Sequence, residues 1–111
     1  MKNKAIDTMV TALKQPLNDM EKSSAYIYLG LLYTDLKDFK KASDNFHIGL
    51  SILEHQEFRY SPNFNKIIKI FIKNGELEKA AYWLDNLTGR KFYDDKFSKL
   101  DQINSYFKEK R

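Results

Sequence analysis

Two stretches of the chain match each other at one constant offset, and this internal repeat restricts the folds that the chain can adopt. The first stretch is YIYLGLLYTDLKDFKKASDNF (residues 26–46) and the second is FNKIIKIFIKNGELEKAAYWL (residues 64–84). Six apolar or small positions pair in one register without a gap: Tyr26 with Phe64, Leu29 with Ile67, Tyr33 with Phe71, Phe39 with Leu77, Ala42 with Ala80, and Phe46 with Leu84. Such a period indicates stacked supersecondary units, each of which needs a neighbour to bury its apolar face.

The spacing inside each stretch is helical. Apolar residues recur at steps of three and four, and a turn signal interrupts both stretches, with DLKDF in the first and Asn74-Gly75 in the second. No alternating run of the kind that forms strands occurs. The same reading along the chain predicts about six helices, at residues 4–15, 23–36, 39–55, 62–74, 76–87 and 94–110. The predicted fold class is therefore all-α, built from antiparallel helix pairs.

Small and polar residues mark the expected helix ends and contacts. Ser23 and Ser61 are predicted N-caps, and Pro62 suits the first turn of a helix. Gly89 follows an apolar pattern as a helix-ending glycine does. Gly30 lies inside a helical pattern, where glycine costs about 1 kcal/mol relative to alanine. We therefore expect the paired helix to approach closely at Gly30.

The first stretch resembles the tetratricopeptide repeat (TPR). That family has an aromatic residue, Leu-Gly and Tyr on its first helix, and then Ala and an aromatic residue on its second helix. The residues in those places are Tyr26, Leu29, Gly30, Tyr33, Ala42 and Phe46. The second stretch fits loosely, since Ile68 replaces the glycine and Leu84 the aromatic residue, and the period is longer than that of the family by one helical turn. The resemblance implies a TPR-like α-solenoid.

The repeat also continues toward both ends of the chain. We predict that residues 1–111 form a single domain. Ala5, Met9 and Leu13 precede Ala42, Phe46 and Leu50 by nearly the same offset, and Leu100 follows Phe64 by a similar one. The predicted parts are the second helix of an incomplete repeat (1–18), a repeat (23–56), a degenerate repeat (61–89) and a capping helix (93–110). We expect the chain to begin mid-repeat, either as a fragment of a longer array or as an independent protein whose opening helix needs a partner.

Composition excludes several classes of protein. The chain has 111 residues and no cysteine, so disulfides and thiolate metal sites are excluded. No apolar run is long enough to span a membrane. The net charge of +4 arises from basic residues interleaved with acids, which is typical of a solvated helix surface and disfavours nucleic-acid binding. We therefore expect a cytoplasmic protein that does not associate with membranes.

No catalytic or metal-binding pattern is present. His47 and His55 are eight residues apart, too far for a pair of metal ligands at one-turn spacing. Asp94 and Asp95 open a helix, where carboxylates interact favourably with the N-terminal dipole. The chain contains no phosphate-binding glycine motif and no zinc-protease motif. The expectation is a protein without enzymatic activity, cofactor or metal.

The TPR resemblance implies that a peptide or partner binds in a groove lined by the first helices of the repeats. Lys66, Lys69 and Lys73 share one helical face, and Asn65 beside them can bond a peptide backbone. The predicted binding residues are Tyr28, Leu31, Asn65, Lys66, Lys69, Lys73 and Gln102, and they suit an acidic or C-terminal-carboxylate peptide with an apolar contact. The aromatic residues Tyr26, Tyr33, Phe46, Phe64, Phe71 and Trp83 are predicted to be core instead.

The long repeats and the Lys, Asn and Ile content resemble the C-terminal repeat domains of peptide-pheromone-sensing regulators of Gram-positive bacteria. That resemblance implies a regulatory module that binds a short signalling peptide. The chain carries no helix-turn-helix segment. Two other functions remain open: a self-assembling adaptor that dimerises through its unpaired opening helix, and a nucleic-acid-binding accessory domain.

Overall fold

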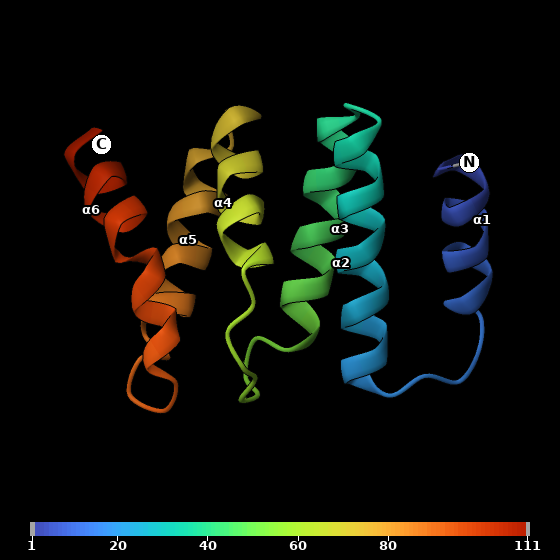
Figure 1. Ribbon diagram of the computed structural model, residues 1–111, viewed down its shortest axis with the longest axis horizontal. Helices are drawn as coiled ribbons and strands as arrows, with labels where there is room; N and C mark the ends of the chain where they lie inside the picture. The colour runs from blue at the N-terminus through green and yellow to red at the C-terminus, as the bar shows by residue number, and fades with distance from the viewer. Residues whose placement is uncertain (1, 111) are drawn as a thin grey trace. The chain divides into compact units, whose positions relative to one another are not determined.

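The chain folds into six α-helices and one 3₁₀-helix, shown in Figure 1, and no strand occurs among residues 2–110. The structure is a computed structural model that describes the backbone of residues 2–110 and the side chains of residues 3–105 and 109. The elements are α1 (Lys2–Ala12), α2 (Asp19–Asp35), α3 (Phe39–Ile52), α4 (Asn63–Lys73), α5 (Leu77–Thr88), the 3₁₀-helix η1 (Asp95–Leu100) and α6 (Asp101–Lys110). The predicted all-α class is confirmed. The helices form two compact units, Met1–Glu57 and Phe58–Arg111, called unit 1 and unit 2 below.

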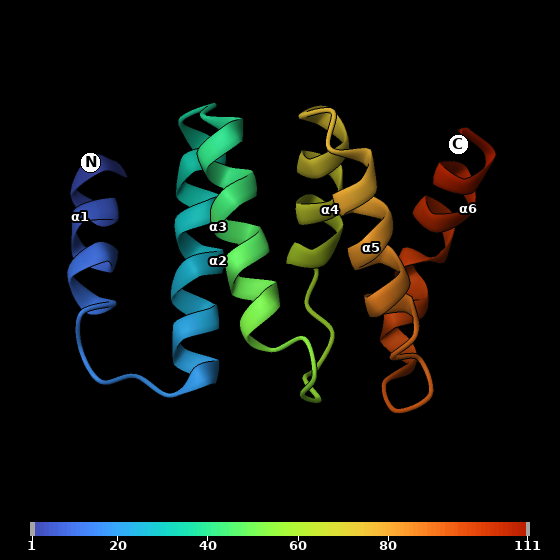
Figure 2. The same ribbon diagram turned by 180° about the vertical axis from the view of Figure 1, so that it is seen from behind.

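In unit 1, α2 and α3 pair side by side (Figures 1 and 2). The pair is close because two glycines lie at its contacts. A Cβ atom on Gly30 would overlap the ring of Phe46, and one on Gly49 would lie 2.9 Å from Cγ1 of Ile27. The buried Ser23 hydroxyl donates a hydrogen bond of 2.7 Å to the Gly49 carbonyl. The predicted close approach at Gly30 is confirmed, and Gly49 provides a second one.

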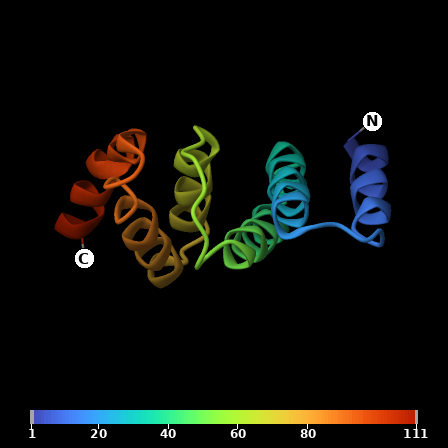
Figure 3. The ribbon, with the colours of Figure 1, turned by 90° about the horizontal axis from the view of Figure 1, so that it is seen from below.

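Helix α1 packs on a different side of α2 from α3, as the view in Figure 3 shows. Ile6 of α1 is buried with Leu29 and Leu32 of α2. Met9 and Leu13 are partly buried and pack against this cluster. One apolar face of α1 is thus held by α2.

Unit 2 consists of the α4–α5 pair together with η1 and α6, which pack against α5. Trp83, Leu84 and Leu87 of α5 have no exposed surface. Phe64 of α4 stacks on Phe97 of η1, with ring centres 5.9 Å apart. The predicted aromatic core is confirmed for Phe46, Phe64, Phe71 and Trp83, which are buried, whereas Tyr26 and Tyr33 are half-buried against the cluster of unit 1.

The extended segment before α4 is fastened to the loop after α5. The Tyr93 hydroxyl accepts a hydrogen bond from the Phe58 amide (3.2 Å) and donates one to the Phe58 carbonyl (3.1 Å). The Arg90 guanidinium lies 3.8 Å from the centre of the Phe58 ring, where a cation interacts favourably with the ring face. The Tyr60 amide donates a 2.9 Å bond to Asp94, and this bond is the main reason that the Asp94 pKa is lowered.

The period of the repeat is present in the backbone as well as in the sequence. Lys37 and Gly75, which are related by the same offset as Tyr26 and Phe64, occupy equivalent places in the α2–α3 and α4–α5 turns. Both have positive φ, at 62° and 76°. The following amide bonds back in the same way at the same distance of 2.9 Å, from Asp38 to the Tyr33 carbonyl and from Glu76 to the Phe71 carbonyl. The two turns therefore share one geometry.

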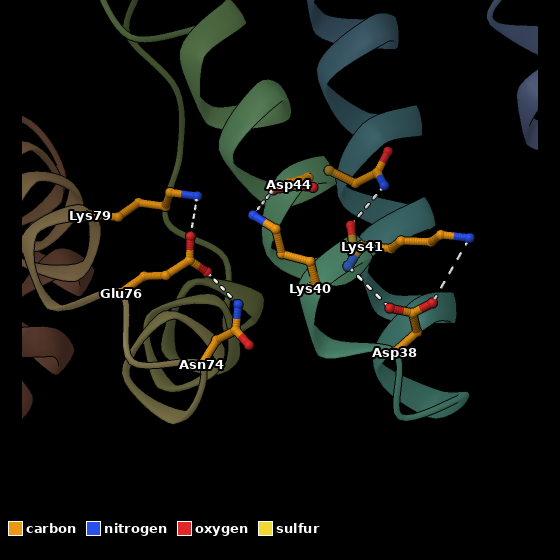
Figure 4. A network of polar contacts seen from close by, with 8 residues as sticks. Asp38, Lys40, Lys41, Asp44, Asn74, Glu76 and Lys79 are labelled. Atoms are coloured by element: carbon orange, nitrogen blue, oxygen red, sulfur yellow. Dashed lines mark hydrogen bonds and ion pairs between the residues drawn. The ribbon is translucent and has the colours of Figure 1, made fainter.

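The side chains around the two turns repeat too, and Figure 4 shows the acid and the lysine of each turn. Each turn has an aromatic ring on the first helix, an acid at the N-cap of the second helix, and a lysine three residues after the acid. They are Tyr33, Asp38 and Lys41 in unit 1, and Phe71, Glu76 and Lys79 in unit 2. The lysine nitrogen lies 5.6 Å from the ring centre in both turns, and 3.9 Å or 2.6 Å, respectively, from the carboxylate oxygen.

Several predicted boundaries are wrong by a turn or less. Helix α2 begins at Asp19, not at residue 23, because Asn18 and Glu21 form a capping box with reciprocal bonds of 2.8 and 3.0 Å. Ser23 is therefore not an N-cap but a buried residue of the helix. The last predicted helix is divided into η1 and α6, and Asp94 caps η1 through the Lys96 amide.

The remaining helix-end predictions hold in part. The N-cap of α4 is Pro62 and not Ser61, although the hydroxyl of Ser61 accepts a bond of 3.2 Å from the Asn63 amide. Gly89 follows the last residue of α5, but its φ of −65° is right-handed, so this glycine is not required by a left-handed cap. The side chain of Phe107, which continues the apolar spacing of the last helix, lies outside the described residues.

Candidate functional site

A hollow of about 530 Å³ lies in unit 2 between α4 and the η1–α6 segment. Its lining combines lysines, amides and isoleucines: Asn65, Lys69, Ile72 and Lys73 from α4, and Lys99, Gln102 and Ile103 from η1 and α6. A volume of this size is within the range of small-ligand and peptide side-chain sites. It is the candidate functional site of the chain.

The helical period of α4 explains its half of the lining. Asn65, Lys69, Ile72 and Lys73 follow each other at steps that keep them on one face of the helix. Another face of α4 is committed to the core, as the complete burial of Ile67 shows. The lining side chains are therefore displayed by a helix whose orientation is held by packing.

The other half of the lining comes from the junction of η1 and α6. Lys99, Gln102 and Ile103 are three and four residues apart, so they share a side of this segment. The Lys99 ammonium lies 5.8 Å from the centre of the Tyr60 ring, which restrains it weakly. Tyr60 itself is partly buried, and this burial raises the pKa of its hydroxyl.

The electrostatic character of the hollow is cationic. Lys69, Lys73 and Lys99 contribute three ammonium groups, and none of the described residues that line it is acidic. Within the part of the chain that the structure describes, no carboxylate forms an ion pair with Lys69 or Lys99. Charge of one sign in a concave surface raises the local concentration of oppositely charged ligands.

The chemistry of the lining favours an acidic peptide segment. Ammonium groups form charge-assisted bonds with carboxylates. Asn65 and Gln102 can each donate to a peptide carbonyl and accept from a peptide amide. Ile72 and Ile103 offer apolar surface for one aliphatic side chain. Together, the ammonium groups, the two amides and the two isoleucines fit an extended peptide that carries carboxylates on either side of an apolar residue.

Four of the seven predicted binding residues are brought together in this hollow: Asn65, Lys69, Lys73 and Gln102. Lys66 shares the helical face of Lys69 and Lys73, but it is exposed on α4 and does not line the hollow. Tyr28 and Leu31 belong to unit 1. Tyr28 is half-exposed at another hollow there, and Leu31 is half-buried.

Three lining residues were not predicted: Ile72, Lys99 and Ile103. The sequence carried a signal for two of them, because Lys99 and Ile103 share a helical side with the predicted Gln102. Ile72 was not predicted because only polar residues of this helix were expected to line the groove. Its half-buried position shows that one isoleucine of this helix faces the hollow.

Within the described part of the chain, no three side chains of His, Cys, Asp or Glu gather as metal ligands would. His47 is half-buried on α3 and His55 is exposed beyond its end. Over the same residues, no helix combines the length and apolar character needed to cross a membrane.

Comparison with known proteins finds no family model, no curated protein and no solved structure that matches this chain.

Proposed function

We propose that the chain is a non-catalytic helical-repeat module that binds a protein or a short peptide, and that the hollow of unit 2 holds an acidic segment of that ligand. The observation that carries the proposal is the convergence of Lys69, Lys73 and Lys99 with two amides and two isoleucines around one concavity. Such a surface provides recognition without any reactive group.

The repeated helix pair supports the choice of class. The α2–α3 and α4–α5 turns share backbone geometry and side-chain contacts at the offset of the sequence repeat. Together with the sequence resemblance, this repetition favours a TPR-like stack in which first helices line a binding groove. We propose that the module belongs to a cytoplasmic regulatory or signalling protein, in keeping with its lack of cysteine.

Peptide binding can be measured by fluorescence anisotropy with a labelled peptide of sequence Glu-Glu-Ile-Glu-Glu. We expect saturable binding to the wild-type chain that weakens as salt is added, since added ions screen the charge interactions. The double substitution Lys69→Glu with Lys99→Glu should reduce the affinity on the order of tenfold or more, because it replaces two attractive contacts by repulsion.

Lys66→Glu is the matched control. It changes an exposed lysine of the same helix by the same charge but lies outside the hollow. Its affinity should remain close to wild type. An equal loss in the control and in the double variant would show that the peptide senses net charge and not this site. A wild-type chain that does not bind the peptide would remove the proposed acidic ligand.

A further inference from the structure

A second hollow, in unit 1, differs in chemistry from the hollow of unit 2. It has a volume of about 460 Å³ and lies between α1 and α2. Its lining includes Met9, Ala12, Leu17, Met20, Glu21 and Tyr28. Met20 and Tyr28 are 50% and 46% exposed. Among the described residues of this lining, Glu21 alone carries a charge. The surface is therefore an open apolar groove.

The internal repeat shows how the equivalent surface of α3 is covered. Met9 and Ala12 of α1 precede Phe46 and Gly49 of α3 by nearly the offset of the repeat. Phe46 and Gly49 are buried, and the helix that covers them is the preceding one, α2, which contacts them at Gly30 and at Ile27. Met9 and Ala12 are only half-buried, and they line the open groove.

The third copy of this surface, on α5 of unit 2, is also covered. Leu84 and Leu87 occupy the places of Phe46 and Gly49 in the second repeat, and neither has exposed surface. Here too the preceding helix, α4, packs against the helix that carries this surface. The covering face of α2 includes the apolar residue Ile27, and α4 has buried apolar residues such as Ile67.

We infer that the α1–α2 groove docks an amphipathic α-helix of a partner protein, seated on α1 as α2 is seated on α3. The groove is continuous with the existing core, because Met9 both lines it and packs against the cluster of Ile6, Leu29 and Leu32. A docked apolar face extends that core over Met9, Ala12 and Tyr28. Methionine adapts its shape readily, which suits a surface that receives an aliphatic side chain from another molecule.

The charge of the groove adds a requirement for the partner. Glu21 uses one carboxylate oxygen to accept a bond of 3.0 Å from the Asn18 amide. It is exposed at the groove, so its negative charge favours a basic residue beside the apolar face of the docked helix. The partner is thus an amphipathic helix with apolar residues at three- and four-residue steps and lysine or arginine next to them.

The chain itself contains a probe with this chemistry. The segment 62–74 includes α4, which combines a buried apolar face with Lys66, Lys69 and Lys73. A fluorescein-labelled and C-terminally amidated peptide of this sequence can be titrated with the full chain. A peptide of the same composition in scrambled order keeps the charge and the hydrophobic content but loses the apolar face.

The inference predicts saturable binding of the 62–74 peptide and much weaker binding of the scrambled one. The groove substitutions Met20→Gln with Tyr28→Ser should weaken binding on the order of tenfold, because they remove apolar surface from the contact. The control Thr11→Gln, on the exposed side of α1, should not. The unit 2 substitutions Lys69→Glu with Lys99→Glu should also leave the affinity unchanged, which separates this site from the proposed peptide hollow.

Three results of the peptide titration would overturn the inference: equal binding of the native and scrambled peptides, unchanged binding by the groove variant, or no binding at all. A wild-type dimer in light scattering that the groove substitutions dissociate would identify a second copy as the occupant, which also contradicts a partner helix. Circular dichroism checks the fold of the groove variant. If that variant loses helicity, Ala12→Gln alone replaces it, and unchanged binding by this substitution counts equally against the groove.

Discussion

Lys37 has a positive φ, and the residue at the equivalent position of the other unit is a glycine. Its φ of 62° is left-handed, a region that costs an L-residue about 1–2 kcal/mol but costs glycine little. Gly75 holds the equivalent place with φ of 76°, and a Cβ atom there would meet no other atom within 4 Å. The effect of a side chain on stability at this turn position should therefore come from backbone conformation and not from packing.

Exchanging these two residue types should shift stability in opposite directions. Lys37→Gly is expected to stabilise the chain by about 0.5–1 kcal/mol, because relief of the left-handed strain exceeds the added entropy of the unfolded chain. Gly75→Lys should destabilise it by a similar amount. Urea unfolding followed by circular dichroism measures both. Shifts of the same sign would contradict the conformational explanation.

Gly30 is small and its contact Phe46 is large. In the second repeat, the two equivalent residues are both of intermediate size. The equivalent positions hold Ile68 and Leu84, which are both fully buried. A Cβ atom on Gly30 would overlap the Phe46 ring, so Gly30→Ala is expected to cost about 1–3 kcal/mol.

A second substitution should relieve that cost. In Gly30→Ala with Phe46→Leu the smaller side chain makes room for the added methyl group. The double variant should therefore be more stable than the sum of the two single effects predicts, and a double-mutant cycle in urea measures the difference. Additive effects would show that the two sites do not contact each other as the structure places them.

At the scale of elements, the number and type of helices could be predicted, and the ends only in part. The three- and four-residue spacing indicates every α-helix, because burial of one face leaves that trace in any amphipathic helix. The start of α2 was missed because the capping residues Asn18 and Glu21 precede the apolar pattern. The division of the last helix at Leu100 follows from the burial of Phe97 and Leu100 in unit 2, which is a tertiary effect.

The connection before α4 depends on the charge of Asp94, whose pKa is lowered chiefly by the bond from the Tyr60 amide. A carboxylate with a lowered pKa in the folded state stabilises that state above the unfolded pKa, near 3.8, and loses this contribution as pH falls through the folded pKa. Asp94→Asn should therefore lower the urea midpoint at about pH 7, and the difference from wild type should shrink at about pH 3. A pH-independent difference would mean that the amide geometry, and not the charge, is responsible.

At the scale of the molecule, only part of the lining of the unit 2 hollow could be predicted. Asn65, Lys69 and Lys73 lie on one helical face, which the sequence alone defines. Their neighbours Lys99 and Ile103 come from a segment much further along the chain, and only the packing of η1 and α6 on α5 brings them close. Tyr28 and Leu31 were predicted to bind the same ligand, but they belong to unit 1 and do not line this hollow. A periodic sequence pattern does not specify which surfaces of a helix lie at a hollow.

We expect α1 to be the least protected helix of unit 1 against hydrogen exchange. It packs on α2 through one apolar face, and Ile6 is its single buried residue among those described. Local opening of such a helix costs little, so its amides should exchange with deuterium on the order of tenfold faster than those of α3. Hydrogen exchange with mass spectrometry resolves the two segments. Equal protection of α1 and α3 would contradict this ranking.

The fluorescence of Trp83 reports on one of the two repeats and not on the other. It is the one tryptophan of the chain, and it lies fully buried in α5. Excitation at the red edge of protein absorption selects tryptophan over tyrosine, so the emission reports the surroundings of α5 and is silent about α2 and α3. Far-ultraviolet dichroism, in contrast, sums the helices of both repeats. A single denaturation series recorded with both signals can therefore assign each loss of structure to one repeat without any added label.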